Sequence, residues 1–240
     1  SGGPCGIAIA LELCAAALPD RLHSADLAQR LKYLYQAAEA LEYLHIKKDI
    51  VHRDIKTANL LLDASDCVKL ADFGMARMAQ HVTGFSSSSN VGRGTPAYSS
   101  PEQLRAEHVT TASDVYSFGV VCYEVVSLRA PWEDKSTHQI ITQIVSLNKC
   151  VPLVQALRAA DLDDDLVRVL GSCVLLDPAS RPSMTQVSQA LLSRLPEQRP
   201  TAGDDWFAGA AKHEGCGSWE IGDGFRTAWL SPRHFVFQET

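Results

Sequence analysis

The chain has 240 residues, of which 46% are hydrophobic and 21% are charged, and this is enough apolar material for one sizeable domain with a soluble surface. The formal net charge is -6 and there is no dense run of Lys and Arg, which argues against a nucleic-acid-binding protein. The most apolar early stretch, residues 7–18, is broken by Glu12 and is too short to span a bilayer, so we predict no membrane segment.

The 7 cysteines are scattered singly, with no C-x-x-C pair. This pattern argues against a disulfide framework and against a zinc site. Reduced thiols in a cytosolic or nuclear protein explain it more simply, and we predict a cytoplasmic location.

A long helix is predicted near the start of the chain, after a loosely alternating, strand-compatible stretch at residues 7–13. Ser24 can cap a helix that runs to about His45. The apolar residues of this stretch recur at spacings of three and four, which predicts one buried face: Leu27, Leu31, Leu34, Ala38, Leu41 and Leu44.

A short β-hairpin is predicted next, with strands at residues 60–62 and 67–70 around the turn at residues 63–66. Asn59 comes directly before the first strand and Asp72 soon after the second. The hairpin should therefore bring these two side chains to the same end of the sheet.

Helices dominate the remainder, and the fold class predicted is α+β, mainly α. After a loop-like stretch at residues 75–98, helices are expected at residues 114–128, 137–147, 164–175 and 183–195. From Pro196 the chain becomes rich in Gly, Pro and irregularly spaced aromatic residues. We therefore expect one domain over residues 1–195 and an extension over residues 196–240.

Two motifs carry chemistry. Residues 52–59 read H-R-D-x-x-x-x-N, and residues 72–74 read D-F-G. A lone H-R-D recurs by chance, but the two motifs together supply a carboxylate for an attacking hydroxyl and oxygen ligands for Mg²⁺. On these residues the chain resembles the protein kinase superfamily, and its fold should resemble the larger, C-terminal kinase lobe.

The resemblance implies a role for each motif residue. Asp54 would orient the substrate hydroxyl and accept its proton, while Asn59 and Asp72 would hold Mg²⁺ against the phosphates of ATP. Lys56 matches the lysine with which Ser/Thr kinases steady the γ-phosphate, and Thr95 would contact both Asp54 and Lys56. The ordinary alternatives are a surface aspartate, a solvated lysine and turn-forming polar residues.

Residues 11–14 resemble the hinge between the two kinase lobes. By this resemblance Leu11 lies behind the adenine pocket, Glu12 and Cys14 meet the adenine edge through their backbones, and Leu61 packs beneath the ring. An apolar strand explains the same residues without a ligand. The cofactors implied are ATP and Mg²⁺, and the partner implied is a protein with a Ser or Thr acceptor.

Other resemblances concern structure and regulation. Glu102 should form a buried ion pair with Arg181, and Asp114 should brace the backbone of the catalytic loop. A phosphate on the activation segment would pair with Arg53 and order that segment. A flexible serine-rich loop explains the candidate acceptors equally well. They are Thr83, Ser86, Ser87, Ser88 and Ser89. Residues 114–119, together with residues 52–62, resemble the tyrosine-kinase-like group of Ser/Thr kinases.

The sequence contains no G-x-G-x-x-G-x-V motif and no V-A-I-K lysine. Three interpretations follow. We favour a part of a longer active kinase, because Asp54, Lys56, Asn59 and Asp72 are intact. The alternatives are a pseudokinase-like scaffold, and a protein-interaction module built around the extension after Pro196. The oligomeric state cannot be read from the sequence.

Overall fold

The structure is a computed structural model that describes residues 12–78 and 95–195. Leu11, the candidate phosphorylation sites at residues 83–89 and the extension at residues 196–240 lie outside the described residues. The α-helices are α1 (Pro19–Leu22), α2 (Leu27–Tyr43), α3 (Pro101–Leu104), α4 (Thr111–Ser127), α5 (Thr137–Ile141), α6 (Leu153–Ala159), α7 (Asp164–Ser172) and α8 (Met184–Leu192). The strands are β1 (Ala16–Ala17), β2 (Ile50–Val51), β3 (Leu60–Leu62), β4 (Val68–Leu70) and β5 (Arg77–Met78).

Helix α2 is the long helix predicted from the apolar spacing, but its N-cap is Asp26 rather than Ser24. The Asp26 carboxylate accepts from the Gln29 backbone N–H at 2.8 Å, whereas the Ser24 hydroxyl donates to the Arg21 carbonyl at 2.9 Å. A capping side chain must reach the free N–H groups of the first turn, and Ser24 lies two residues before the N-cap position. The predicted apolar face is buried at Leu31, Leu34, Ala38 and Leu41.

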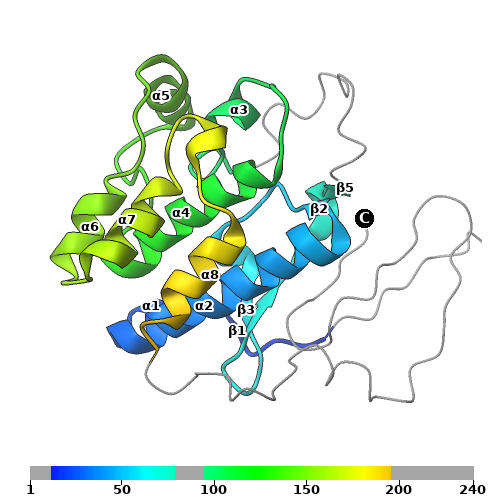
Figure 1. Cartoon of the computed structure of the whole chain (residues 1–240), viewed down its shortest axis with the longest axis vertical. Coiled ribbons are helices and arrows are strands. Elements are labelled where there is room, and N and C mark those ends of the chain that lie inside the picture. Colours follow the sequence, from blue (N-terminus) through cyan, green and yellow to red (C-terminus); the bar gives the residue numbers. More distant parts are fainter. Residues whose placement is uncertain (1–11, 79–94, 196–240) are drawn as a thin grey trace, which may run out of the picture.

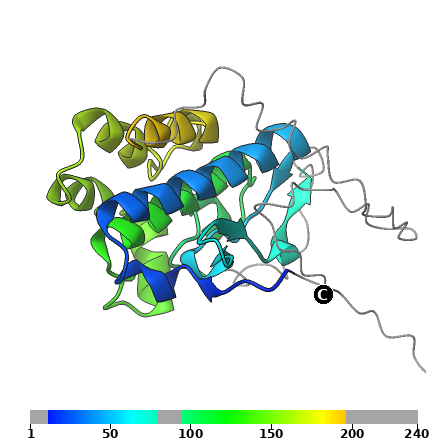
Figure 2. The ribbon, with the colours of Figure 1, turned by 90° about the horizontal axis from the view of Figure 1, so that it is seen from below.

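The core lies between α2, α4 and the helices that cover them. Helices α2 and α8 lie side by side along their lengths (Figures 1 and 2), and α4 packs on both α6 and α7. Helix α4 is buried over most of its length, including Tyr116 and Phe118. In Figure 1, α6 and α7 lie at the left of the molecule, α5 lies at the top and the β2–β5 pair lies at the right.

A small antiparallel sheet has the order β1-β3-β4, and β3 and β4 form the predicted hairpin with Leu61 opposite Lys69. The Asp63 carboxylate closes the turn by accepting from the backbone N–H groups of Ser65 at 2.8 Å and Cys67 at 3.0 Å. These bonds satisfy donors that the turn would otherwise leave unpaired. The sheet thus keeps the two ends of the hairpin, next to Asn59 and Asp72, together.

The later predicted helices are present with shifted ends, and three short helices were missed: α1, α3 and α6. The β2–β5 pair was also missed, in part because residues 75–98 were expected to be a loop. The mainly helical content and the small antiparallel sheet agree with the predicted α+β class. Among the described helices, none combines the length and apolar character needed to cross a lipid bilayer.

Candidate active site

The β3–β4 hairpin brings Asn59 and the D-F-G segment together. The backbone N–H of Ala71, next to Asp72, donates to the Asn59 carbonyl at 2.9 Å. Asp72 has a left-handed backbone with φ 62° and caps the short turn at Phe73–Met75, where the Gly74 N–H donates to its Oδ1 at 3.3 Å. The two residues predicted to bind Mg²⁺ therefore lie at the same end of the hairpin, as the sequence predicted.

The catalytic-loop side chains contact one another directly. Lys56 Nζ donates to Asp54 Oδ2 at 2.7 Å and reaches Thr95 Oγ1 at 3.4 Å. Asn59 Nδ2 donates to the Asp54 carbonyl at 2.8 Å and to Asp54 Oδ2 at 3.1 Å. Thr95 thus meets Asp54 through Lys56, and the lysine positive charge lies between the carboxylate and the hydroxyl.

The donor set fits Mg²⁺ better than a metal that takes several protein ligands. Since Asn59 bonds to Asp54 through Nδ2, its Oδ1 is not engaged in that bond and can serve as an oxygen ligand. In residues 12–78 and 95–195, no group of three or more His, Cys, Asp or Glu side chains is arranged to hold a metal ion. Mg²⁺ usually binds through one or two carboxylates together with substrate phosphates, so a sparse pair is the expected form of the site.

Asp114 of α4 anchors the catalytic loop through hydrogen bonds to its backbone. Its Oδ2 accepts from the His52 backbone N–H at 2.8 Å, and its Oδ1 accepts from the Arg53 backbone N–H at 2.8 Å. His45 Nε2 lies 2.9 Å from the same Oδ2. Asp114 therefore braces the loop as predicted, through the backbone rather than through the side chains of the motif.

His52 is a packed loop residue. Burial lowers the pKa of its imidazole, although the Asp114 carboxylate and the Ala71 carbonyl oppose this shift. The ring is neutral at pH 7, lies 3.1 Å from the Ala71 oxygen through Nε2, and stacks at a tilt on Phe73 with ring centres 4.9 Å apart. His52 thus joins the catalytic loop to the D-F-G segment.

Three residues that the sequence analysis did not select join the catalytic loop to α4. Glu124 Oε2 accepts from the Tyr98 hydroxyl at 2.6 Å and from the Thr57 hydroxyl at 2.8 Å. Burial raises the pKa of Tyr98, and the nearby Glu124 carboxylate raises it further, so the phenol stays protonated and donates. Since Thr57 follows Lys56 and Tyr98 lies near Thr95, this cluster supports both ends of the Lys56–Thr95 contact.

The predicted ion pair between Glu102 and Arg181 is present and buried. Arg181 Nη1 lies 2.6 Å from Glu102 Oε1, and Arg181 Nη2 lies 3.0 Å from Glu102 Oε2. The Ser113 hydroxyl also donates to Glu102 at 2.7 Å. Burial acts to raise the pKa of Glu102, but the Arg181 hydrogen bonds and charge outweigh it and leave the pKa below its usual value.

The described residues of the predicted hinge lie beside the sheet. The Ala15 backbone N–H donates to the Leu62 carbonyl at 2.7 Å, so the segment that begins at Glu12 enters the sheet next to β3. Cys14 is half-buried, and burial raises the pKa of its thiol. Leu61 is half-buried on β3. Contact of these residues with adenine stays a prediction.

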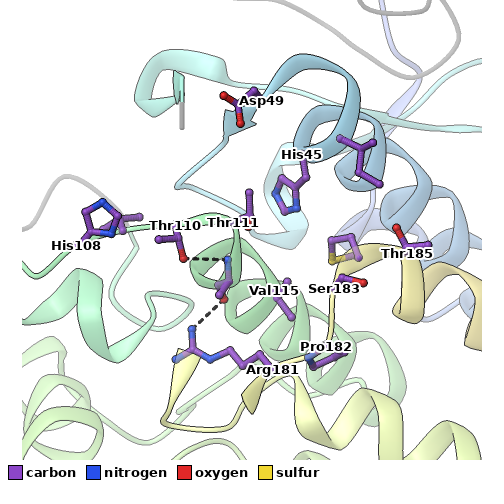
Figure 3. A pocket seen from close by; sticks show the side chains of 14 residues that line it. His45, Asp49, His108, Thr110, Thr111, Val115, Arg181, Pro182, Ser183 and Thr185 are labelled. Carbon is purple, nitrogen blue, oxygen red and sulfur yellow. Dashed lines mark hydrogen bonds between the residues drawn. The ribbon is translucent and has the colours of Figure 1, made fainter. Parts of the chain in front are cut away.

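A pocket of about 510 Å³ lies on another face of the protein (Figure 3). It is lined by the turn after α2, the loop before α4 and the start of α8, and Arg181 and Thr110 both bond to the Ala112 backbone there, at 2.9 and 3.3 Å. None of the predicted site residues that the structure describes lines it. It is therefore not the predicted nucleotide site.

Comparison with known families agrees with the geometry of the catalytic loop. The family model of the protein kinase domain matches residues 6–193. The chain belongs to the protein kinase family. The kinase match includes the catalytic loop, the D-F-G segment and the helices that support them.

Individual relatives carry kinase names. The chain is 34% identical over 167 residues to the serine/threonine-protein kinase CTR1 of Arabidopsis thaliana, covering 69% of this chain and 19% of that protein. It is 31% identical over 206 residues to the calmodulin-binding receptor-like cytoplasmic kinase 1 of the same plant, covering 80% of this chain and 43% of that protein. A putative serine/threonine-protein kinase/receptor of Acanthamoeba polyphaga mimivirus is 35% identical over 166 residues, which are 69% of this chain and 10% of that protein. The chain thus spans less than half the length of each of these relatives.

Proposed function

We propose that this chain carries the catalytic loop and the Mg²⁺-binding residues of an ATP-dependent protein serine/threonine kinase. The observation that supports this most directly is the contact of Lys56 Nζ with both Asp54 Oδ2, at 2.7 Å, and Thr95 Oγ1, at 3.4 Å. In this reading residues 1–195 form the hinge and larger lobe of the kinase domain.

Each side chain has a defined task in the transfer. Asp54 orients the acceptor hydroxyl and takes up its proton as the oxygen forms a bond to the γ-phosphorus of ATP, whose β–γ bridging bond breaks. Lys56 steadies the charge of the phosphoryl group in transfer, and Asn59 holds Asp54 in place through two hydrogen bonds. Asn59 Oδ1 and the Asp72 carboxylate would hold Mg²⁺, which, when bound, neutralises phosphate charge.

The class of acceptor follows from Lys56 and Thr95. By the resemblance to protein kinases, a lysine at the position of Lys56 in contact with a threonine at the position of Thr95 is the arrangement expected for Ser and Thr acceptors. Two of the relatives named above, the Arabidopsis CTR1 and the mimivirus protein, carry serine/threonine-protein kinase in their names, which supports the same class. We therefore propose protein substrates with Ser or Thr acceptors.

Substitution of Asp54 tests the proposal. In the full-length protein that the gene encodes, Asp54→Asn should slow phosphate transfer to a generic Ser/Thr substrate by roughly 100- to 10,000-fold, because the substitution removes the proton acceptor. Ser65→Ala, in the turn at the other end of the hairpin, is the matched control and should keep the rate. An Asp54→Asn protein that is folded and as fast as the wild type would overturn the proposed role.

A pseudokinase-like scaffold is the second candidate, and the missing glycine-rich motif favours it. By the same feature we expect the 240-residue chain alone to bind ATP weakly and to transfer phosphate poorly, since it lacks the loop that covers the phosphates. Robust transfer by this chain would contradict that expectation. If no encoded form transfers phosphate but deletion of residues 197–240 abolishes partner binding, the interaction function is the better description.

A further inference from the structure

Lys69 is a buried charge in the small sheet that the proposed mechanism does not use. It lies at the centre of β4, where its side chain is only 4% exposed. Its Nζ lies 3.3 Å from Glu12 Oε1 and 3.5 Å from Asp63 Oδ2. A buried ammonium group is stable only where carboxylates or other acceptors compensate for its lost hydration, and Glu12 and Asp63 both contribute to that compensation.

The two carboxylates beside Lys69 Nζ differ in how they are held. Asp63 is fixed in the hairpin turn by the backbone N–H groups of Ser65 and Cys67, and burial, which alone would raise its pKa, is outweighed by these bonds and by Lys69 so that the pKa is lowered. Glu12 is 40% exposed and lies in irregular chain before β1. Main-chain bonds tie this part of the chain to β3 from Ala15 onward. Lys69 therefore links the hairpin turn to the segment that begins at Glu12.

The contact of Lys69 with Glu12 lies between the predicted adenine contacts and the predicted metal-binding residue. Glu12 and Cys14 are the residues predicted to meet the adenine edge, and β4 leads directly to Asp72, which is predicted to hold the metal ion. A displaced Glu12 would move the adenine contacts relative to the phosphate contacts. One ATP molecule must make both sets of contacts at once, so the separation between them matters for binding.

We propose that Lys69 is a positioning residue for the nucleotide pocket: by holding Glu12 Oε1 it fixes the segment from Glu12 to Cys14 against the hairpin. The nucleotide part of this proposal rests on the proposed kinase function, whereas the positioning of the segment does not. Lys69 Nζ lies beside Glu12 and Asp63, and Lys69 has no task in the proposed transfer, so its loss should weaken ATP binding without slowing the chemical step.

The first experiment measures kinetics in the longest encoded form of the protein. Lys69→Met keeps the apolar stem and leaves no stranded charge, because Glu12 reaches solvent and Asp63 keeps its two backbone donors. KM for ATP should rise roughly three- to tenfold while kcat stays within about twofold, the pattern of lost binding without lost chemistry. Glu12→Gln should give the same rise, and the double variant should add little to either.

Controls separate positioning from general damage. Lys69→Arg keeps the charge and should restore KM for ATP to near the wild-type value. Lys135→Met removes an exposed lysine in the loop before α5 and should change neither constant. An unchanged KM in Lys69→Met, or a fall in kcat at unchanged KM, would overturn the proposal.

The second experiment is amide hydrogen exchange of the 240-residue chain without nucleotide. In Lys69→Met the amides of Ala15 and Leu18, which bond to Leu62 and Leu60, should exchange faster, while amides at the centre of α4 should not change. Equal exchange at Ala15 and Leu18, or faster exchange throughout, would overturn the positioning role. If no wild-type form transfers phosphate, the proposed function fails, and this second experiment still decides whether Lys69 holds the segment.

Discussion

The hydroxyl group of Tyr116 lies in the core, at a residue that is 1% exposed, and it has no hydrogen-bond partner among the described residues. A buried unpaired polar group costs about 1–3 kcal/mol of stability. Tyr116→Phe should therefore raise the free energy of unfolding, by about 1 kcal/mol, since the ring that packs under Arg181 is kept. Urea unfolding followed by circular dichroism measures the change.

Tyr98→Phe is the matched control for this prediction. In the wild type the Tyr98 hydroxyl donates to the Glu124 carboxylate at 2.6 Å. Its removal in Tyr98→Phe should therefore lower the free energy of unfolding, by about 1.5–3 kcal/mol. If Tyr116→Phe were destabilised as much as Tyr98→Phe, the Tyr116 hydroxyl would have a partner after all, such as an ordered water.

For single residues, the sequence predicted the contacts that the resemblance to protein kinases implies and missed contacts that only folding brings together. The contact of Lys56 with Thr95 and the pair of Glu102 with Arg181 follow from matched motifs, and both are present. The cluster around Glu124 and the link from Lys69 to Glu12 join residues from distant segments whose spacing carries no signal. The available sequence signal for the second link was a lysine between the apolar Val68 and Leu70 of a predicted strand.

Helix α2 offers a test at the scale of single elements. Asp26→Ala should lower the free energy of unfolding by about 0.5–2 kcal/mol, because it removes the carboxylate that caps the Gln29 N–H. Ser24→Ala, at the residue expected to be the cap, should cost clearly less, since its hydroxyl bonds only within the preceding turn. Equal losses in the two variants, measured by chemical denaturation, would contradict the observed cap.

Glycines in two helices make a second matched pair. A Cβ at Gly119 of α4 would lie 2.7 Å from Val174 Cγ1 and 2.8 Å from Cys173 Cβ, so α4 and the end of α7 would have to separate. Gly119→Ala should therefore be destabilising by about 1–3 kcal/mol although alanine favours helices.

Gly171→Ala of α7 is the control. Its Cβ would meet Val154 Cγ2 at 2.8 Å, but Val154 is 40% exposed and can turn aside. The gain in helix propensity, about 1 kcal/mol, should then leave Gly171→Ala as stable as the wild type or more so. Thermal unfolding of the two variants compares them, and a Gly119→Ala protein at least as stable as Gly171→Ala would contradict the close packing of α4.

Long elements were predicted better than short ones because periodicity needs length. The apolar face of α2 repeats over several turns, whereas β2 and β5 have 2 residues each and show no pattern. Helix α6 begins after Pro152 with no capping side chain, so neither a cap nor a long stripe marks it. The N-cap of α2 was predicted wrongly because Ser and Asp are both good N-cap residues. Only the backbone conformation in the folded chain selects Asp26 over Ser24.

Across the whole molecule, the pair of Glu102 and Arg181 ties α3 to the loop before α8, 79 residues later. The folded state lowers the pKa of Glu102 from its ordinary value of 4.5, so the unfolded chain binds this proton more readily. The stabilisation is therefore fully present above that ordinary value and is lost as the pH falls through the lower, folded value.

Glu102→Gln tests this window, because it removes the titrating group and keeps the shape of the side chain. Free energies of unfolding measured from about pH 7 down to about pH 3 should fall less steeply in the variant than in the wild type. Arg181→Met should cost about 3–5 kcal/mol near neutral pH, because it strands a buried carboxylate. Parallel acid curves for Glu102→Gln and the wild type would exclude the pair as the source of acid sensitivity.

Asp114 grips the catalytic loop by the amides of residues 52 and 53, which every amino acid except proline possesses. A non-proline replacement of either side chain keeps both N–H donors to Asp114, although the left-handed backbone of Arg53, with φ 73°, restricts which residues fit there. Related proteins can therefore differ in the side chains at these two positions and still hold the catalytic loop against α4. A substitution of Asp114 would remove both bonds and release the loop, whatever the sequence of the motif.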